Sequence, residues 1–404
     1  MPVAVTAPGV ERDAVLHALS ASDDPIRRLL QKAGARRGWW PAGRRWQRSY
    51  ARFDETAAPR CILMYETIGE PQQLCVVELH DARPDADEPA QIALADAALG
   101  WMRIERFPSD PCLPTLAEII ERAGAARIVR YRPRRRCTLR LRGEANANAP
   151  WAKVFADERG ERIHRESISL HDAARAGALG FHVARPGAWD ARLRLLTQGH
   201  VAGAPVIDTL HGPHGRELAS RMGAACATLA VSPLRPSELH DGETQLARST
   251  RYAAELCRRI PALADDVAHL LAQLRALHRA AAPGRLRPIH GAPHAHQWLD
   301  GPAGLGLVDF DRHCFGDPEL DVATFVAETD FEDRARVDVD ALNRAFVDAY
   351  EDVAGPLDPA LLAAYRSHKR LAKALKASRA PRADAAAKAT RNLRRALRCL
   401  KEMS

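Results

Sequence analysis

The sequence predicts an α+β protein in which most of the β-strands precede most of the helices. Short apolar runs bounded by turn residues, which are typical of strands, lie between about residue 60 and residue 200. After residue 208, most of the chain has apolar residues at helical spacing. Strands and helices that occupy separate parts of a chain are typical of α+β folds.

Length and composition indicate an ordinary globular protein. The chain has 404 residues, enough for two or three domains, with 46% hydrophobic and 27% charged residues. We find no apolar run long enough to span a membrane and no secretory signal at the N-terminus. The eight cysteines are scattered without a C-x-x-C pair, so we expect reduced thiols and a cytoplasmic location.

The positive charge lies mainly at the C-terminal end. The net charge is +8, and the segment from Arg366 to Glu402 contains 13 Lys/Arg against 2 Asp/Glu. Helical spacing in Pro359–Ser378 and Ala383–Lys401 predicts two helices that pack on the preceding helices with their charges facing solvent. Nucleic acid is therefore not expected as a partner, although a basic arm for polyanions is the alternative.

Residues 1–118 carry no recognisable motif and are expected to form an accessory segment of unknown role. Asp13–Lys32 has helical periodicity, and Arg60–Tyr65 and Gln73–His80 are predicted to pair as a hairpin. Three tryptophans, at positions 39, 40 and 46, stand among arginines. Core packing is the favoured interpretation, and a surface that stacks on bases is the alternative.

Three predicted strands and a helix follow. Ile128–Arg142 is predicted to form a hairpin, and Trp151–Phe155 a further strand that carries Lys153. A helix is expected from about Glu161 to Ala176, with Glu166 beside its apolar face.

The most informative stretch contains two polar loops separated by an apolar hairpin. The first loop, His290–Gln297, reads HGAPHAHQ. The second follows the apolar pair Leu307-Val308, presents Asp309 and Asp311, and leads through a Gly-Asp-Pro turn into a helix. Polar groups that a rigid hairpin presents at strand ends are well placed to hold a cation beside a reacting group.

These loops resemble those of the aminoglycoside phosphotransferase and choline kinase-like family, a branch of the protein-kinase-like fold. The family pattern is H-G-D-x-H-x-x-N, an apolar hairpin, then I-D-[FW] and G-D-P-x-x-D. The matching residues, in order and spacing, are His290, Gly291, His294, Asp309, Phe310, Gly316, Asp317, Pro318 and Asp321. Ala292 stands in place of the family's catalytic Asp, and Gln297 in place of its metal-binding Asn.

The resemblance, which covers about residues 125 to 350, implies a two-lobed protein-kinase-like fold. A β-rich N-lobe would span residues 119–200, and a helical C-lobe with the catalytic-type loops would span residues 201–404. Lys153 would bind the phosphates of ATP, with Glu166 as the partner that holds it. Gln198 and His200 would lie at the hinge that binds the adenine. In the Pro133–Arg136 turn, Arg134, Arg135 and Arg136 could contact phosphate, or the turn could simply be solvated.

The resemblance also implies ATP- and Mg²⁺-dependent transfer to a hydroxyl of a small molecule. Asp309 and Gln297 would bind Mg²⁺, because both offer oxygen ligands. His290 would shape the catalytic loop, and Asp311 would contact metal or acceptor. Ala292 cannot accept the proton of the acceptor, so transfer is expected to be impaired. The alternative is a pseudokinase that binds nucleotide or a partner without phosphoryl transfer.

Two further hypotheses concern other ligands. His290, His294 and His296 have a spacing that can reach one Zn²⁺, although no helix is predicted to align them. The acidic residues near the last motif would suit a cationic acceptor, or form a solvated helix face. These residues are Glu319, Glu328, Asp330, Glu332 and Asp333.

Overall fold

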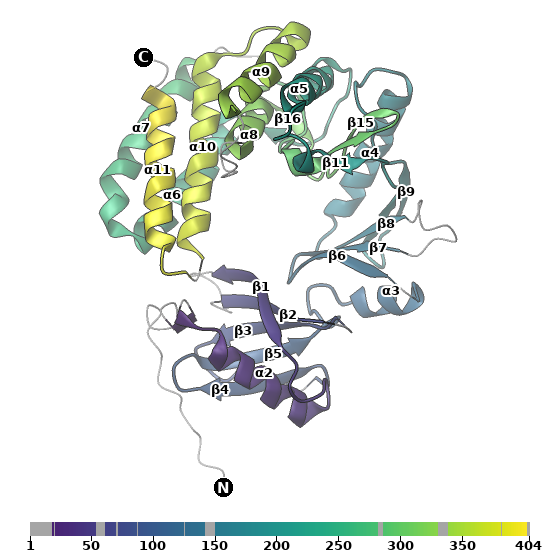
Figure 1. The fold of residues 1–404 in the computed structure, drawn as a ribbon, viewed down its shortest axis with the longest axis vertical. Coiled ribbons are helices and arrows are strands. Elements are labelled where there is room, and N and C mark those ends of the chain that lie inside the picture. The colour runs from purple at the N-terminus through teal and green to yellow at the C-terminus, as the bar shows by residue number, and fades with distance from the viewer. Residues whose placement is uncertain are drawn as a thin grey trace.

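The computed structural model describes residues 18–401, except 20, 54–60, 70–71, 87, 125, 142–149, 282–285, 330–337 and 381. Its described part contains two five-stranded sheets in the N-terminal half and a mostly helical C-terminal half (Figure 1). No helix among these residues is long and apolar enough to cross a bilayer. All eight cysteines are free thiols.

The first sheet is antiparallel and has the strand order β1-β2-β3-β5-β4. Its strands are β1 (Trp46–Phe53), β2 (Cys61–Thr67), β3 (Leu74–His80), β4 (Gln91–Asp96) and β5 (Gly100–Arg106). The predicted β2–β3 pairing is confirmed. Helix α2 (Asp24–Arg37) has Pro25 in its first turn, where proline is favoured, and residues 13–17 of the predicted Asp13–Lys32 helix lie outside the described residues.

The tryptophans belong to the core of this first unit, as the favoured interpretation held. Trp39, Trp40 and Trp46 are all buried, and the ring of Trp40 packs edge-on against that of Trp46. The indole N–H of Trp40 donates to the carbonyl of Leu30 in α2, which ties the helix to the sheet. These rings are therefore unavailable for stacking on bases.

The second sheet, with strand order β6-β7-β8-β10-β9, is the predicted N-lobe sheet. Its strands are β6 (Arg127–Arg132), β7 (Arg136–Arg140), β8 (Trp151–Phe155), β9 (Pro186–Asp190) and β10 (Leu195–Gln198), with helices α3 (Leu116–Arg122) and α4 (Arg159–Arg175). Met64 and Val76 of the first sheet share one core cluster with Leu139 and Val154 of the second. The two sheets are therefore joined by a continuous hydrophobic core.

The C-lobe is built mainly from helices. These are α5 (Gly215–Val231), α6 (Gly242–Arg259), α7 (Ala264–Ala280), α8 (Glu319–Thr329), α9 (Val339–Ala354), α10 (Pro359–Ser378) and α11 (Ala385–Lys401), with the 3₁₀ turns η1 (Val206–Asp208), η2 (Pro261–Leu263) and η3 (Ala295–Gln297). Two small sheets carry the loops, in the orders β11-β14-β15 and β12-β16-β13. Their strands are β11 (Ala204–Pro205), β12 (Leu239–His240), β13 (Arg287–Ile289), β14 (Trp298–Gly301), β15 (Gly304–Leu307) and β16 (Cys314–Gly316).

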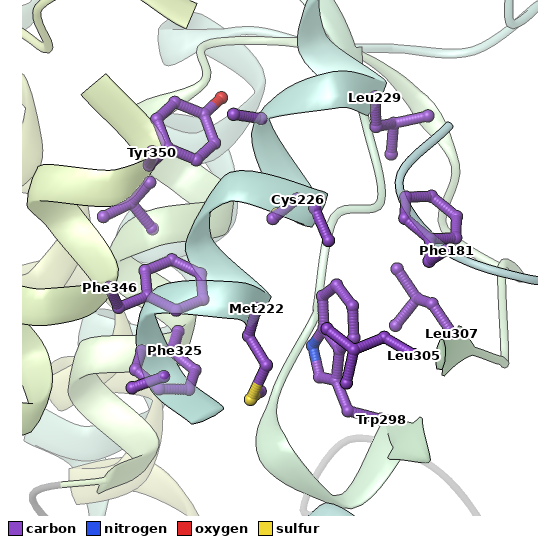
Figure 2. Close-up of a cluster of buried hydrophobic side chains, with 14 of the residues drawn as sticks. Phe181, Met222, Cys226, Leu229, Trp298, Leu305, Leu307, Phe325, Phe346 and Tyr350 are labelled. Atoms are coloured by element: carbon purple, nitrogen blue, oxygen red, sulfur yellow. The ribbon is translucent and has the colours of Figure 1, made fainter. Parts of the chain in front are cut away.

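The largest core of the C-lobe lies where α5 and α9 meet the β14–β15 hairpin (Figure 2). Phe325 of α8 stacks on Phe346 of α9 at 3.9 Å between ring centroids. Trp298 is fully buried, and its indole N–H donates to the carbonyl of Pro293 at 3.1 Å. The hydrophobic core therefore holds the loop that precedes β14 directly.

The two C-terminal helices pack as predicted. Buried Leu393 and Leu400 of α11 join a cluster with Leu371 and Leu375 of α10, together with α6 and α7. The exposed residues of α11 include Lys388, Arg391, Arg394, Arg395, Arg398 and Lys401. The basic side chains of this helix therefore face solvent.

Because Leu393 is fully buried between helices, Leu393→Ala is expected to lower the free energy of unfolding by at least about 2 kcal/mol. Leu397→Ala, on the same helix at a partly buried position, is the matched control and should cost less. Chemical denaturation of both variants measures the difference. Equal losses would contradict this packing of α11.

Candidate active site

The two polar loops meet at the end of the β14–β15 hairpin. The first follows β13 and the second follows β15. His290 is fully buried, its Nε2 donates to the carbonyl of Val308 at 3.1 Å, and its Nδ1 accepts the backbone N–H of Ala292. Burial lowers the pKa of His290 to about 3, so its ring is neutral. His290 thus joins the loops structurally, as the resemblance implied.

A buried carboxylate fixes the start of the first loop. The backbone N–H groups of His290 and Gly291 each donate to Asp321 of α8 at 2.7 Å. Burial raises the pKa of Asp321 to about 7, although these two N–H groups oppose the shift. Gly291 has a φ of +80°, and a Cβ there would lie 2.6 Å from the carbonyl oxygen of Arg312. The loops approach each other this closely because residue 291 has no side chain.

Two cations and two carboxylates meet between the lobes. Lys153 Nζ lies 2.6 Å from Asp309 Oδ1 and 2.6 Å from Asp311 Oδ1. Arg136 of β7 pairs with Asp311 and lies 3.7 Å from Asp309. This four-residue group brings the predicted phosphate-binding lysine to the predicted metal-binding aspartate, which is 156 residues away in the chain.

The charges in this group stabilise one another. Burial would raise the pKa of Asp309, but Lys153 and Arg136 outweigh it and hold that pKa well below its usual range. Burial would likewise lower the pKa of Lys153, but Asp311 and Asp309 outweigh it, so that pKa is raised. Lys153 and Asp309 are therefore both charged near neutral pH.

Gln297 supplies an open oxygen beside Asp309. Its side chain is buried, its Nε2 lies 3.4 Å from Asp309 Oδ2, and its Oε1 accepts no hydrogen bond from the residues that the structure describes. A buried amide oxygen without a partner is costly unless a ligand uses it. Mg²⁺ binds oxygen and takes only one or two ligands from protein when phosphates supply others. The oxygen atoms of Asp309 and Gln297 are therefore compatible with Mg²⁺ as a ligand set, and their role in metal binding stays a prediction.

A cavity of about 380 Å³ adjoins this group between the lobes. Lys153 and Asp309 line one part of it. The predicted hinge residues Gln198 and His200 line another part, together with Val201. A cavity of this size suits a drug-sized or nucleotide-sized ligand.

The predicted partnership between Lys153 and Glu166 is wrong. Glu166 instead accepts from Arg162, one helical turn earlier in α4, at 2.9 Å, and from the hydroxyl of Ser237 at 2.8 Å. An i,i+4 pair of opposite charge competes directly for the carboxylate. Lys153 has Asp309 and Asp311 as its partners in place of Glu166.

The three arginines after Pro133 have three different environments. Arg134 turns toward the first sheet and pairs with Glu78, Glu105 and Asp110, at 2.8, 2.7 and 3.2 Å. Arg135, which we predicted to bind the cofactor, is exposed and does not line the cavity. Arg136 is the one that faces the cavity.

The structure does not support the zinc hypothesis or an open acidic patch. Both ring nitrogens of His290 are engaged, and the described residues hold no group of three or more His, Cys, Asp or Glu suited to a metal. Glu319 is fully buried and accepts the N–H of Asp358, and Glu328 pairs with Lys373. Asp330, Glu332 and Asp333 lie outside the described residues.

The architecture is that of a two-lobed, protein-kinase-like phosphotransferase fold. A model of the phosphotransferase enzyme family, abbreviated APH, matches residues 148–362, which is more than half of the chain. The chain therefore belongs to this family. No curated protein sequence matches it.

Solved structures of similar fold share little sequence with the chain. One is APH(2")-IIia in its GDP and kanamycin complex, with 13% identity, a TM-score of 0.50, and coverage of 70% of this chain and 97% of that one. Another is a choline/ethanolamine kinase family protein from Mesorhizobium loti, with 18% identity, a TM-score of 0.49, and coverage of 71% and 91%.

Proposed function

We propose that this protein transfers a phosphoryl group from Mg·ATP to a hydroxyl of a small molecule. The observation that carries the proposal is the convergence of Lys153, Asp309 and Gln297, with its open amide oxygen, at the edge of the interlobe cavity. Family membership and the nucleotide-bound neighbour of similar fold support it.

Each residue has a distinct part in this proposal. Lys153 and Arg136 would supply positive charge to the phosphates, which would compete with Asp309 and Asp311 for these two cations. Mg²⁺, held by Asp309 and Gln297, would neutralise phosphate charge. The backbone near Gln198 and His200 would bind the base. His290 and Asp321 keep the catalytic loop in place.

Mg·ATP is expected to raise the melting temperature of the protein. Saturation at 100 times the dissociation constant is worth about 2.7 kcal/mol. Lys153→Met and Asp309→Asn should each abolish the shift, because they remove the phosphate-binding charge and the metal ligand. Lys388→Met, at an exposed position on α11, is the control and should retain it.

The same titration with Mg·GTP tests which purine base the site prefers. A wild-type protein that melts at the same temperature with and without millimolar Mg·ATP and Mg·GTP would refute nucleotide binding at this site. Omitting Mg²⁺ should weaken the shift if Asp309 and Gln297 act through the metal.

A second function, nucleotide binding without transfer, is favoured by one observation. Ala292 occupies the position of the proton acceptor and has no group that takes a proton. A general base contributes about 10²- to 10⁴-fold to the rate, and a loose phosphoryl transition state requires little early proton removal. Transfer slowed by the lack of a general base is therefore the primary proposal, and a pseudokinase is the alternative that turnover assays separate from it.

A further inference from the structure

A second cavity, of about 180 Å³, lies beside the catalytic loop. Gly291, next to Ala292, lines it, and so does Asp311 of the group formed with Lys153, Arg136 and Asp309. The other lining residues come from α4, the segment around β12, α6, the segment that leads into β16, α8 and α10. Its place beside residue 292 is where an acceptor would have to lie if the proposed phosphoryl transfer is correct.

The carboxylates in this cavity already have cationic partners. Asp311 pairs with Lys153 and Arg136. Glu238 pairs with Arg162 at 3.3 Å, and Arg162 also pairs with Glu166. Each carboxylate in the walls thus has a cationic partner before any ligand binds, although Glu238 shares Arg162 with Glu166.

The histidines in the walls add no negative charge. His240 Nε2 bonds to the side chain of Gln245 at 2.8 Å, and His313 Nδ1 bonds to the carbonyl of Ile289 at 2.9 Å. Burial lowers the pKa of both histidines, so they are neutral near pH 7.

Three cations remain, each from a different element. Arg248 comes from α6, Arg312 from the loop after β15, and Lys369 from α10, and all three line the cavity. None of them has a hydrogen bond or ion pair from its side chain to another residue in the described part of the chain. The position of Arg312 depends on Gly291, whose missing side chain lets the backbone of Arg312 approach the catalytic loop.

These cations also repel one another. Burial lowers the pKa of Lys369 to about 7, with Arg312 and Arg248 adding to the shift and Asp321 and Glu328 opposing it. The pKa of Arg248 is lowered by burial and by Arg312. A bound anion would reduce both the repulsion among these three unpaired cations and the cost of burying their charge. The cavity is therefore suited to a ligand of negative charge.

We propose that this cavity binds the oxyanion of the acceptor, so that the substrate is a small hydroxylated carboxylate or phosphate ester. The guanidinium groups of Arg248 and Arg312 suit the paired oxygens of either anion. A cationic acceptor would meet three like charges and be repelled. The volume of about 180 Å³ suits a small group and is below the range for large ligands. This inference rests on the proposed function.

Equilibrium binding of glycerate, glycerol phosphate and ethanolamine to the full chain tests the proposal. A non-hydrolysable ATP analogue with Mg²⁺ fills the nucleotide site. We expect the two anions to bind and ethanolamine not to bind. Arg312→Gln and Lys369→Met should each weaken anion binding by about tenfold or more, because each removes a charged hydrogen-bond donor. Arg251→Gln, exposed on α6, is the matched control and should leave binding unchanged.

The pH dependence is a second readout of the same site. Glycerate stays ionised, whereas Lys369 loses its proton as the pH rises above about 7. The affinity for glycerate should therefore fall as the pH rises from about 6 to about 9. Lys369 is protonated below this window and neutral above it, and the bound anion shifts the pKa of Lys369 upward. Lys369→Met should remove this dependence.

The outcomes separate this inference from the proposed function. Preferential binding of ethanolamine, or anion binding that Arg312→Gln and Lys369→Met leave intact, would overturn the inference. Anion binding that depends on Lys153 but not on Lys369 would place the anion in the nucleotide cavity and also overturn it. Anion binding at this cavity without phosphoryl transfer to glycerate, glycerol phosphate or any other hydroxylated anion would overturn the proposed function and leave the anion site standing.

Discussion

Ala292→Asp is expected to raise the turnover of a suitable acceptor by about 10²- to 10⁴-fold, because it restores a general base in the catalytic loop. The loop is held by the Asp321 bonds to His290 and Gly291, which involve backbone groups and do not depend on the side chain at 292. The position is half-buried, so the new carboxylate can be accommodated. Steady-state assays with the acceptors above, or ATP hydrolysis if none is turned over, measure the gain.

Ala292→Asn is the matched control, because it has the shape of the aspartate without its basicity. It should not reproduce the gain. The affinity for Mg·ATP should change little in both variants, because residue 292 does not line the nucleotide cavity. If the aspartate variant binds nucleotide normally and still shows no gain, the pseudokinase alternative replaces the enzyme.

Arg134→Met is expected to lower the free energy of unfolding by about 3–5 kcal/mol, because it leaves the buried carboxylates of Glu105 and Asp110 without their counter-charge, while Glu78 keeps Arg103. The side chains of Glu78, Glu105 and Asp110 are at most 1% exposed, and all three pair with Arg134. Arg134 also has a φ of 64°, an unfavourable conformation for a residue with a side chain. The ion pairs and the bond from its N–H to Asp110 hold it there.

Two comparisons sharpen this experiment. Arg127→Met, at an exposed position on the same sheet, should have little effect on denaturation. Adding Glu105→Gln to Arg134→Met should recover part of the loss, since it removes one of the stranded charges. A loss below about 1 kcal/mol for Arg134→Met would mean that the network does not stabilise the junction of the two sheets.

The sequence predicted the parts of the site that depend on order along the chain. The spacing of the two polar loops was sufficient to place His290, Gln297 and Asp309 near one another, because a short hairpin connects them. The strand–helix order likewise pointed to Lys153, although the protein brings it to Asp309 from 156 residues away.

The errors come from side-chain competition that the motifs do not encode. We predicted that Glu166 pairs with Lys153, but its carboxylate pairs with Arg162, one helical turn away. The i,i+4 spacing of Arg162 and Glu166 in the sequence could have indicated this pair. The orientation of Arg136 could also have been predicted from the sequence. Cys137 and Leu139 are buried, so strand alternation puts Arg136 and Thr138 on the opposite face, and Thr138 pairs with Lys153.

The remaining features depend on contacts between distant segments. Arg134 meets Glu78 across 56 residues, and Arg248, Arg312 and Lys369 come from separate elements of the C-lobe. No periodicity or spacing marks such groups before the fold is known. The predicted acidic patch illustrates the same limit, because Glu319 is buried by α10 and neighbouring loops that its own segment does not reveal.

The shared core and the Arg134 network join the first sheet and the N-lobe sheet into one packed body. The chain passes from this body to the C-lobe near Gln198–Pro205, beside the interlobe cavity. Cys61 of β2 lies in the part of the body near α6, where the charge of Arg259 acts on its thiol. A rotation of the N-lobe about the Gln198–Pro205 passage would therefore carry the first sheet with it and would displace β2 farther than the residues that line the cavity. A spectroscopic label on β2 would register such a rotation without touching the site.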